Sequence, residues 1–419
     1  MWTIEAILIG KISAAAFAGV GMAVQIMLVV LTVLLTFIVG SSIIINRYLG
    51  AGDTWEANHI LGQALMLGII LNLIIALVWY FGGPTIFKLI KEGGSEARQA
   101  GLIYLKTLAL FAPVVLTNFV ALGVIRGAGD TRHAMTINLS INTLNLILAP
   151  IFIFGLFGFP RLEVRGAALA MGTAHSLGSF ATLYLLRSRK SVLFLSFREL
   201  TTPNFKTFRR LFNAGIPTTV EQLVWAFGQL VVTGYAAVLG IHMLAAHQVF
   251  LRIQNILSMF YLGFGMGAMT LVGKNVGADD PKAAEKTAVT ANLVVLVFAV
   301  MVFLLLVLFR RPLVTVFTSD PDVVRIGASV MIVFALVQIP KALDGVLIGN
   351  LRGVGDLKWL MWLTIASVML LEIGLNWVLV FTLGYSLMAL WMVHLLDEFL
   401  RTVVNTWRFR SGKWKTFDL

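Results

Sequence analysis

The chain has 419 residues, of which 59% are hydrophobic and 12% charged, and its formal net charge is +12. A soluble domain carries about 25% charged residues, so this composition excludes a chain that exposes most of its surface to water. Cysteine is absent, which excludes disulfides, zinc fingers and thiol catalysis, and the basic residues lie at the ends of apolar runs, which argues against a nucleic-acid partner.

Apolar segments recur along the chain, and many reach the roughly 20 residues that a helix needs to cross about 30 Å of hydrocarbon. With turn residues and charges as boundaries, they predict an all-α polytopic membrane protein in the lipid bilayer. A short, truncated first helix is followed by eleven full-length ones. The predicted spans are residues 1–10, 14–46, 58–82, 100–124, 133–157, 166–187, 209–239, 243–273, 285–309, 326–350, 358–383 and 387–409.

Two glycine-rich turns reveal an internal repeat. The stretch IRGAGDTR at 125–132 returns as LRGVGDLK at 351–358. Two further pairs of segments, LGAGD with VGADD and FAP with QIP, match at nearly the same offset. A duplication of this kind covers six spans, so both copies cross the membrane in the same direction. We therefore predict two six-helix bundles, related by a parallel pseudo-twofold axis, around a central cavity.

The repeat sets the predicted domain boundaries. An N-lobe covers residues 1–188, a cytoplasmic linker 189–206 and a C-lobe 207–419. In each turn the glycines end one helix, the aspartate caps the next, and the arginine lies near a negative helix C-terminus. If the chain enters from the cytoplasm, most of its 32 Lys and Arg residues lie on that side. The positive-inside rule then predicts that both termini are cytoplasmic.

The paired Arg-Gly-small-Gly-Asp turns, each after the fourth span of its half, resemble those of the multidrug and toxic compound extrusion (MATE) family. GAGD at 50–53, AAHQ at 245–248 and GIP at 215–217 are also similar to family motifs. The resemblance covers essentially the whole chain. It implies a monomeric secondary antiporter in the cytoplasmic (inner) membrane of a prokaryote. Such a protein exports small organic cations in exchange for H+ or Na+ by alternating access and needs no cofactor.

Two acidic positions of the family pattern differ in the N-lobe. The fifth span of many bacterial members reads Asn-x-x-Leu-Asp-Pro, whereas here Asn145 is followed by Ala149 and Pro150. Ala149 can carry neither a proton nor Na+, so we expect Asn145 to line a cavity or join helices. Glu5 stands where the first span of such members has an aspartate, and this resemblance makes it a coupling candidate.

The strongest candidate from the residues themselves is Glu221. A carboxylate inside a bilayer costs several kcal/mol unless it is paired, hydrated or protonated. Glu221 follows Pro217 by one turn and has no basic residue within four positions. Trp225 lies one turn further on the same face, beside Gln222, and suits an organic cation through cation–π attraction. We expect Glu221 to bind the coupling ion or the organic cation in turn, and it is the candidate ligand if that ion is Na+.

Other acids of the C-lobe have basic residues close by in sequence. Asp344 lies three residues after Lys341, and Asp397 and Glu398 lie four and three residues before Arg401. These spacings predict ion pairs within one helix. Because Lys341 follows a mid-helix proline, Asp344 also remains a candidate for the cavity.

Two further residues are candidates for cation coupling. Glu372 lies near the middle of the eleventh span and has no basic residue within four positions. His247 opens the eighth span, and histidine changes charge near neutral pH. His247 would serve equally well as a hydrogen-bonding contact to a neighbouring helix.

Two other function classes are weighed against antiport. A flippase for lipid-linked oligosaccharides, in the same broad superfamily, would need unpaired Arg and Lys facing its cavity to hold a diphosphate. Acids outnumber bases within the predicted spans, which favours cations. An intramembrane enzyme ranks last, because no HExxH, GxSxG or paired catalytic aspartate motif occurs in the sequence.

Overall fold

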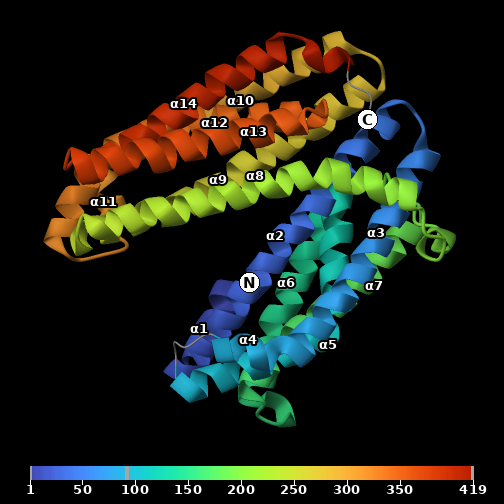
Figure 1. The fold of residues 1–419 in the computed structure, drawn as a ribbon. Coiled ribbons are helices and arrows are strands. Elements are labelled where there is room, and N and C mark those ends of the chain that lie inside the picture. The colour runs from blue at the N-terminus through green and yellow to red at the C-terminus, as the bar shows by residue number, and fades with distance from the viewer. Residues whose placement is uncertain (1, 90–93, 417–419) are drawn as a thin grey trace. The chain divides into compact units, whose positions relative to one another are not determined.

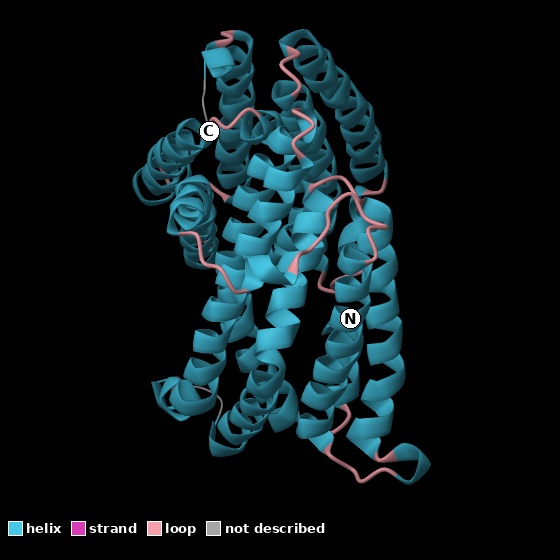
Figure 2. Cartoon of the chain, turned by 90° about the vertical axis from the view of Figure 1, so that its right-hand side faces the viewer, coloured by secondary structure: helices cyan, strands magenta, loops and turns pink. Residues whose placement is uncertain are grey.

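The computed structural model describes residues 2–89 and 94–416, so the predicted boundaries at Met1 and Leu419 lie outside the described part. All regular elements of that part are helices, as Figure 2 shows, in agreement with an all-α fold. Contacts between residues divide the chain into two compact units. Unit 1 comprises Met1–Ile45 and Thr54–Gly215, and unit 2 comprises Asn46–Asp53 and Ile216–Leu419.

Figure 1 labels the helices in chain order. Those that begin in unit 1 are α1 (Trp2–Gly10), α2 (Ala14–Gly50), α3 (Thr54–Leu77), η1 (Val78–Gly82), α4 (Gly83–Leu89), α5 (Gly94–Gly127), α6 (Thr131–Phe154), η2 (Leu156–Gly158), α7 (Glu163–Arg187), η3 (Phe197–Leu200) and α8 (Phe205–Val238). The last residues of α2 and the larger part of α8 belong to unit 2. The other helices of unit 2 are α9 (Ile241–Gly277), α10 (Pro281–Leu308), α11 (Arg310–Thr315), α12 (Pro321–Gly353), α13 (Leu357–Ser367), η4 (Val368–Leu375), η5 (Val378–Thr382), α14 (Leu387–Arg410) and η6 (Lys413–Thr416).

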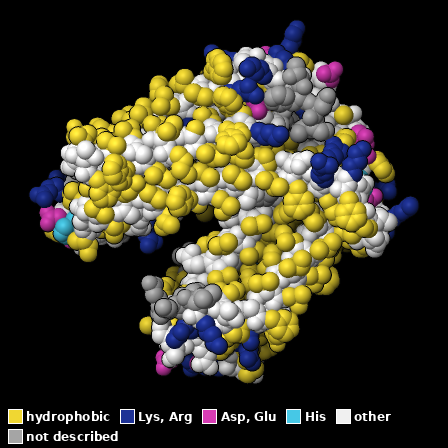
Figure 3. Space-filling model, viewed as in Figure 1, with side chains coloured by type: hydrophobic (Ala, Val, Ile, Leu, Met, Phe, Trp, Pro, Cys, Tyr) yellow, Lys and Arg dark blue, Asp and Glu magenta, His cyan; other side chains and the backbone are white. Residues whose placement is uncertain are grey.

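Among the described helices, eight are long and apolar enough to cross a membrane: α2, the continuous α3–α4 segment, α5, α6, α9, α10, α12 and the segment from α13 to η5. The sequence predicts eleven full-length spans. The other three, α7, α8 and α14, are also long but more polar, and in α14 the cause is a buried charged face. Apolar side chains cover the long faces of the helices in Figure 3, and many Lys and Arg side chains gather near helix ends.

In the two repeated turns the second glycine has the same backbone conformation, but the aspartate side chain has a different partner in each turn. Gly129 and Gly355 have φ angles of 99° and 85°, in the left-handed region that favours glycine. Asp130 caps α6 as predicted, because its side chain accepts a hydrogen bond from a backbone N–H of the first turn. The cap predicted for Asp356 is wrong: its carboxylate lies 2.6 Å from Nε of Arg408 instead.

Hydrogen bonds from neighbouring side chains stabilise the ionised form of Asp130. Burial alone would raise the pKa of this carboxyl group. Hydrogen bonds from the Ser191 hydroxyl, at 2.6 Å, and from His133 outweigh burial and lower the pKa below its ordinary value. Asp130 therefore joins the start of α6 to the connection that follows α7.

The first glycine of each turn allows close helix packing. A Cβ on Gly127 would lie 2.0 Å from Oγ of Ser42 on α2, and a Cβ on Gly353 would lie 2.7 Å from the carbonyl oxygen of Met269 on α9. Ser42 and Met269 are separated in sequence by nearly the same number of residues as the two glycines. In each unit, the helix before the turn thus packs tightly at its C-terminal end.

The connection between α7 and α8 is held against α3. Gln63, fully buried on α3, donates hydrogen bonds to the backbone oxygens of Glu199 and Thr202 at 3.0 and 2.9 Å. His59, one turn earlier, lies 2.6 Å from the carboxylate of Glu199 and 3.1 Å from the Thr207 hydroxyl. The predicted linker is therefore an ordered part of unit 1 where these contacts hold it.

Candidate functional site

One face of α14 carries a dense group of buried charges in unit 2. His394, Glu398, Arg401 and Asn405 follow one another at intervals of three or four residues, with Asp397 directly before Glu398, which places them on one side of the helix. Each is less than a tenth exposed. The other side of α14 is apolar, with Met392, Leu396, Phe399 and Val403 exposed. α14 therefore turns its charges toward the protein and its hydrocarbon side chains outward.

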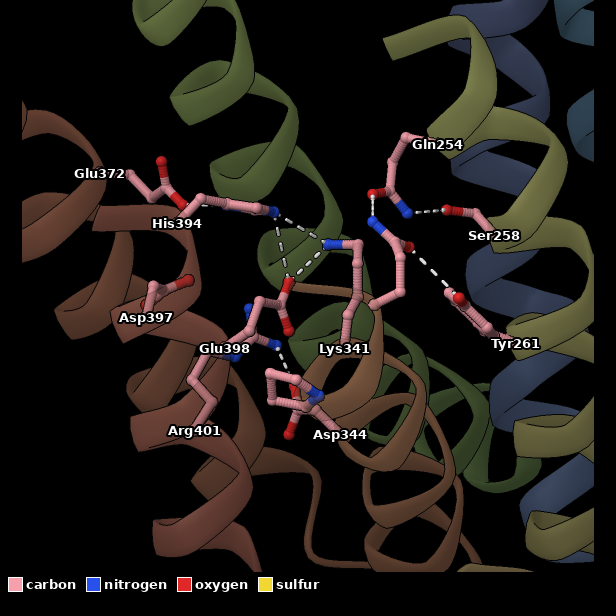
Figure 4. A network of polar contacts seen from close by, with 12 residues as sticks. Gln254, Ser258, Tyr261, Lys341, Asp344, Glu372, His394, Asp397, Glu398 and Arg401 are labelled. Atoms are coloured by element: carbon pink, nitrogen blue, oxygen red, sulfur yellow. Dashed lines mark hydrogen bonds and ion pairs between the residues drawn. The ribbon is translucent and has the colours of Figure 1, made fainter. Parts of the chain in front are cut away.

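His394 joins two carboxylates and an ammonium group (Figure 4). Its Nδ1 contacts the carboxylate of Glu372 on η4. Its Nε2 lies 3.3 Å from Nζ of Lys341 on α12 and 3.7 Å from Oε1 of Glu398. Lys341 and Glu398 are themselves a close ion pair. Sequence reasoning missed His394, although its four-residue spacing from Glu398 was a usable signal.

A second ion pair joins α14 to α12. Arg401 reaches Asp344 with Nη2 3.1 Å from Oδ2, and Asn405 donates a hydrogen bond of 2.8 Å to the other oxygen of Asp344. The predicted pairs within single helices, of Lys341 with Asp344 and of Arg401 with Glu398, are wrong. Both cations reach across to the facing helix instead, where a buried partner is shielded from water and the attraction is stronger.

Asp397 lies on the same face of α14 but is bound differently. It accepts a close hydrogen bond from Ser367, the last residue of α13, rather than forming the intrahelical ion pair predicted with Arg401. One oxygen of Asp397, one oxygen of Glu372 and a ring nitrogen of His394 lie within 4.8 Å of one another. Glu372 and His394 contact each other directly, so a metal ion bound to those two atoms would first have to separate them, since ligand atoms about 2 Å from a metal lie about 3 Å apart.

Glu221 is not the unpaired acid that the sequence suggests. Its Oε1 accepts a hydrogen bond of 2.9 Å from Nη2 of Arg352, and the two side chains are only 6% and 11% exposed. The residues are 131 positions apart, so no local pattern could reveal the pair. Arg352 belongs to the repeated RGVGD turn, where a role at the helix C-terminus was expected. An ion or ligand at Glu221 would therefore have to compete with this guanidinium group.

Trp225, one turn after Glu221 on α8, already holds a cation. Nζ of Lys341 lies 5.7 Å from the centre of its indole ring. The cation at this ring belongs to the protein, and the predicted contact of Trp225 with an organic cation stays a prediction. Gln222 is half-buried beside these residues on α8.

His247 borders the network from α9. It is 2% exposed, and its Nε2 lies 3.5 Å from the hydroxyl of Thr233. Its ring is 5.6 Å from that of Trp391, which in turn is 5.5 Å from the ring of His394. Trp391 therefore separates the two histidines.

The unit 1 candidates lie in less charged surroundings. Glu5 on α1 is 4% exposed and accepts a hydrogen bond of 3.1 Å from the Tyr104 hydroxyl. Asn145 and Ala149 on α6 are buried. Among the described residues, Glu5 forms no ion pair.

The network in unit 2 has more negative than positive charge. Asp344, Glu372, Asp397 and Glu398 are acidic, whereas only Lys341 and Arg401 carry fixed positive charge within this set. Hereafter these six residues and His394 are called the α12–α14 network. With every carboxyl group ionised and the imidazole neutral, the network has two more negative than positive charges. An unbalanced buried charge raises the free energy of a membrane protein. The arrangement therefore favours the uptake of protons or other cations.

The comparisons with known proteins agree with this membrane setting. The family model MatE matches residues 1–151 and 217–378. The chain is 27% identical over 407 residues to "Probable multidrug resistance protein NorM" of Thermotoga maritima, covering 97% of this chain and 87% of that protein. It is 26% identical over 422 residues to "Uncharacterized transporter YisQ" of Bacillus subtilis, covering 99% and 90%.

Solved structures share the fold. One described as "Crystal structure of MATE in the bent conformation" matches with a TM-score of 0.88 at 21% identity, over 97% of this chain and 89% of that one. Another, "Outward-facing conformation of a multidrug resistance MATE family transporter of the MOP superfamily", matches with a TM-score of 0.87 at 20% identity, over 98% and 92%. These likenesses confirm the all-helical polytopic membrane fold.

Proposed function

The chain belongs to the MatE family of transporters, and from this premise we propose that it exports organic cations in exchange for H+ or Na+. Membership of a transporter family also agrees with the prediction that the chain is not an enzyme. The relatives named for multidrug resistance support small organic molecules as its substrates. The proposed location is the cytoplasmic membrane of a prokaryote.

The observation that carries the proposal is the excess of buried carboxylates in unit 2. The α12–α14 network and the neighbouring Glu221 offer negative charge at membrane depth, and each fixed cation there is already paired. A carboxylate that holds a proton or Na+ cannot also neutralise an organic cation. Competition for one charge couples the inward movement of one cation to the outward movement of the other when the site opens to one side of the membrane at a time.

Alternating access between two lobes is the proposed conformational cycle. The lobes are residues 1–188 and 207–419, related by a parallel pseudo-twofold axis around a central cavity, with residues 189–206 as the cytoplasmic linker. The matched close contacts of Gly127 and Gly353 support the repeat. Cytoplasmic termini and a monomeric state complete the proposal.

The flippase alternative is less well supported. A diphosphate-linked sugar requires unpaired positive charge, and the fixed cations of the α12–α14 network are paired with carboxylates. The charge balance there has the sign that suits a cationic cargo.

Transport by purified protein tests the function. We would reconstitute the chain in liposomes and follow ethidium, an organic cation, under a pH gradient and a Na+ gradient imposed separately. We expect ethidium to move against at least one gradient, and Glu221→Gln, which keeps a hydrogen-bond acceptor for Arg352, to lose most of this coupling. Glu163→Gln is the matched control, because Glu163 is half exposed in a surface ion pair. Wild-type coupling in Glu221→Gln would refute the assignment of Glu221.

A further inference from the structure

We propose that the coupling ion is a proton and that it is exchanged at His394, between the carboxylates of Glu372 and Glu398. The inference rests on the proposed antiport and names both the ion and the residue that carries it. Imidazole is the side chain that ordinarily gains or loses a proton between pH 5 and 8. A histidine held between two carboxylates in a buried network is therefore suited to taking up the missing positive charge.

The geometry assigns different tasks to the two ring nitrogens. Nδ1 contacts Glu372, so it donates its hydrogen to that carboxylate in both charge states. Nε2 lies 3.3 Å from Nζ of Lys341, which can donate a hydrogen bond to it while the ring is neutral. When Nε2 binds a proton it becomes a donor, and Glu398 at 3.7 Å is the acceptor within reach. The exchangeable proton is thus the one on Nε2.

Charged and titratable groups surround His394 on several helices. Among the described residues they are Glu372 on η4, Lys341 and Asp344 on α12, Asp397, Glu398 and Arg401 on α14, His247 behind Trp391 and Tyr261 near Glu398 on α9, and Glu221 with its partner Arg352 at α8 and α12. Glu221 and Arg352 balance each other. The remaining fixed charges are negative in sum, so a proton bound to the imidazole balances one of them.

The same geometry disfavours Na+. A hard cation prefers a shell of oxygen ligands with its own space. Here Lys341, the imidazole and Arg401 each already contact an oxygen of Glu398, Glu372 and Asp344, respectively, so Na+ would have to share these carboxylates with groups that are already bound. A proton needs no such shell, because it binds to a single lone pair of Nε2.

Protonation also changes the position that Lys341 can hold. The imidazolium repels the ammonium group and competes with it for Glu398, while Trp225 offers a nearby aromatic face. Lys341 directly follows Pro340, which lacks the N–H needed for a helical hydrogen bond, and Thr402 of α14 donates to the Pro340 carbonyl oxygen at 2.9 Å. A proton on His394 thus weakens the link between α12 and α14 where α12 bends most easily.

The test uses liposomes that enclose the pH indicator pyranine, in Na+-free buffer, with ethidium as the transported cation. Wild-type protein should move protons against ethidium. His394→Asn keeps an N–H for Glu372 but cannot become charged, so we expect at least tenfold less proton counterflow and ethidium binding that no longer varies with pH. His242→Asn is the control, since His242 is half exposed and lies 3.6 Å from Asp320.

A second variant keeps the proposal testable if His394→Asn does not fold, as judged by size-exclusion chromatography. Glu372→Gln retains the acceptor for Nδ1 and removes one negative charge. The protonated ring is then less favoured, so the midpoint of the pH profile of transport should move to lower pH by about one unit. An unchanged midpoint would overturn the proposal.

The outcomes separate the inference from the function on which it rests. Proton counterflow at the wild-type level in folded His394→Asn overturns the inference alone. Exchange of ethidium for Na+ but not for protons by the wild-type protein also leaves the antiport intact and overturns the inference. Movement of ethidium under neither gradient overturns the proposed antiport itself.

Discussion

Replacing Arg352 with methionine should strongly destabilise unit 2. Methionine fills a similar volume but leaves the carboxylate of Glu221 buried without its cation. The pair is separated by 2.9 Å, and the two side chains are 11% and 6% exposed, so water cannot replace the lost partner. Removing one member of such a buried pair costs about 3–5 kcal/mol, a large part of the stability of a typical domain.

Two further variants test whether the stability lost in Arg352→Met comes from the ion pair. Adding Glu221→Gln to Arg352→Met removes the unpaired charge, so the double variant should recover most of the loss. Arg126→Met is the matched control, because Arg126 holds the corresponding position in the first turn and is exposed. A surface substitution of this kind changes stability by about 0.5 kcal/mol or less.

Reversible unfolding by sodium dodecyl sulfate in mixed micelles, followed by circular dichroism, gives the free energies of all three variants. The reasoning is refuted if Arg352→Met is as stable as Arg126→Met. It is equally refuted if the double variant is no more stable than Arg352→Met, since the loss would then arise from packing and not from charge.

Three further predictions concern packing, capping and the connection after α7. A Cβ at Gly353 would lie 2.7 Å from a backbone oxygen of α9, so Gly353→Ala should lower the unfolding free energy by about 1–3 kcal/mol; Gly263→Ala, with nothing within 4 Å, should not. The lowered pKa of Asp130 means that its cap contributes stability above the ordinary pKa of about 4 and loses it as the pH falls below that value. The difference in unfolding free energy between the wild-type protein and Asp130→Asn should therefore shrink from about pH 5 to pH 3. Gln63→Ala removes the hydrogen bonds that hold the connection to α3, and trypsin should then cleave after Arg198 several times faster; an unchanged cleavage rate would show that other contacts suffice.

The positions of the helices could be predicted because their signals are local. The predicted span 133–157 lies within a few residues of α6, since an Asp-initiated apolar run and a glycine near residue 155 mark its two ends. The glycines of the repeated turn could also be predicted, because the second glycine is left-handed in both copies. The predicted aspartate cap is correct for Asp130 and wrong for Asp356. In the part of the chain that the structure describes, eight rather than eleven helices are apolar enough to span a membrane by composition alone. The other predicted spans have polar faces, and the hydropathy of a single helix does not show what those faces pack against.

The charge pairs could not be predicted, because they depend on which helices face each other. Lys341 and Asp344 are three residues apart, yet both bind side chains of α14 more than fifty residues away. Arg352 was assigned to its own helix end and instead reaches α8. Sequence spacing identified Glu221, Asp344 and Glu372 as acids of interest, but only the tertiary arrangement supplied their partners.

The helical segment from α13 to η5 places Glu372 by an unusual backbone. Glu372 lies within η4, a π-helical stretch of 8 residues, and a π turn contains one residue more than an α turn. Loss of a single residue there would let the wide turn close to an ordinary α turn, which would change the direction of the side chains inside the stretch, Glu372 among them. A homologue with a one-residue deletion in this stretch is therefore expected to lack the contact between Glu372 and His394.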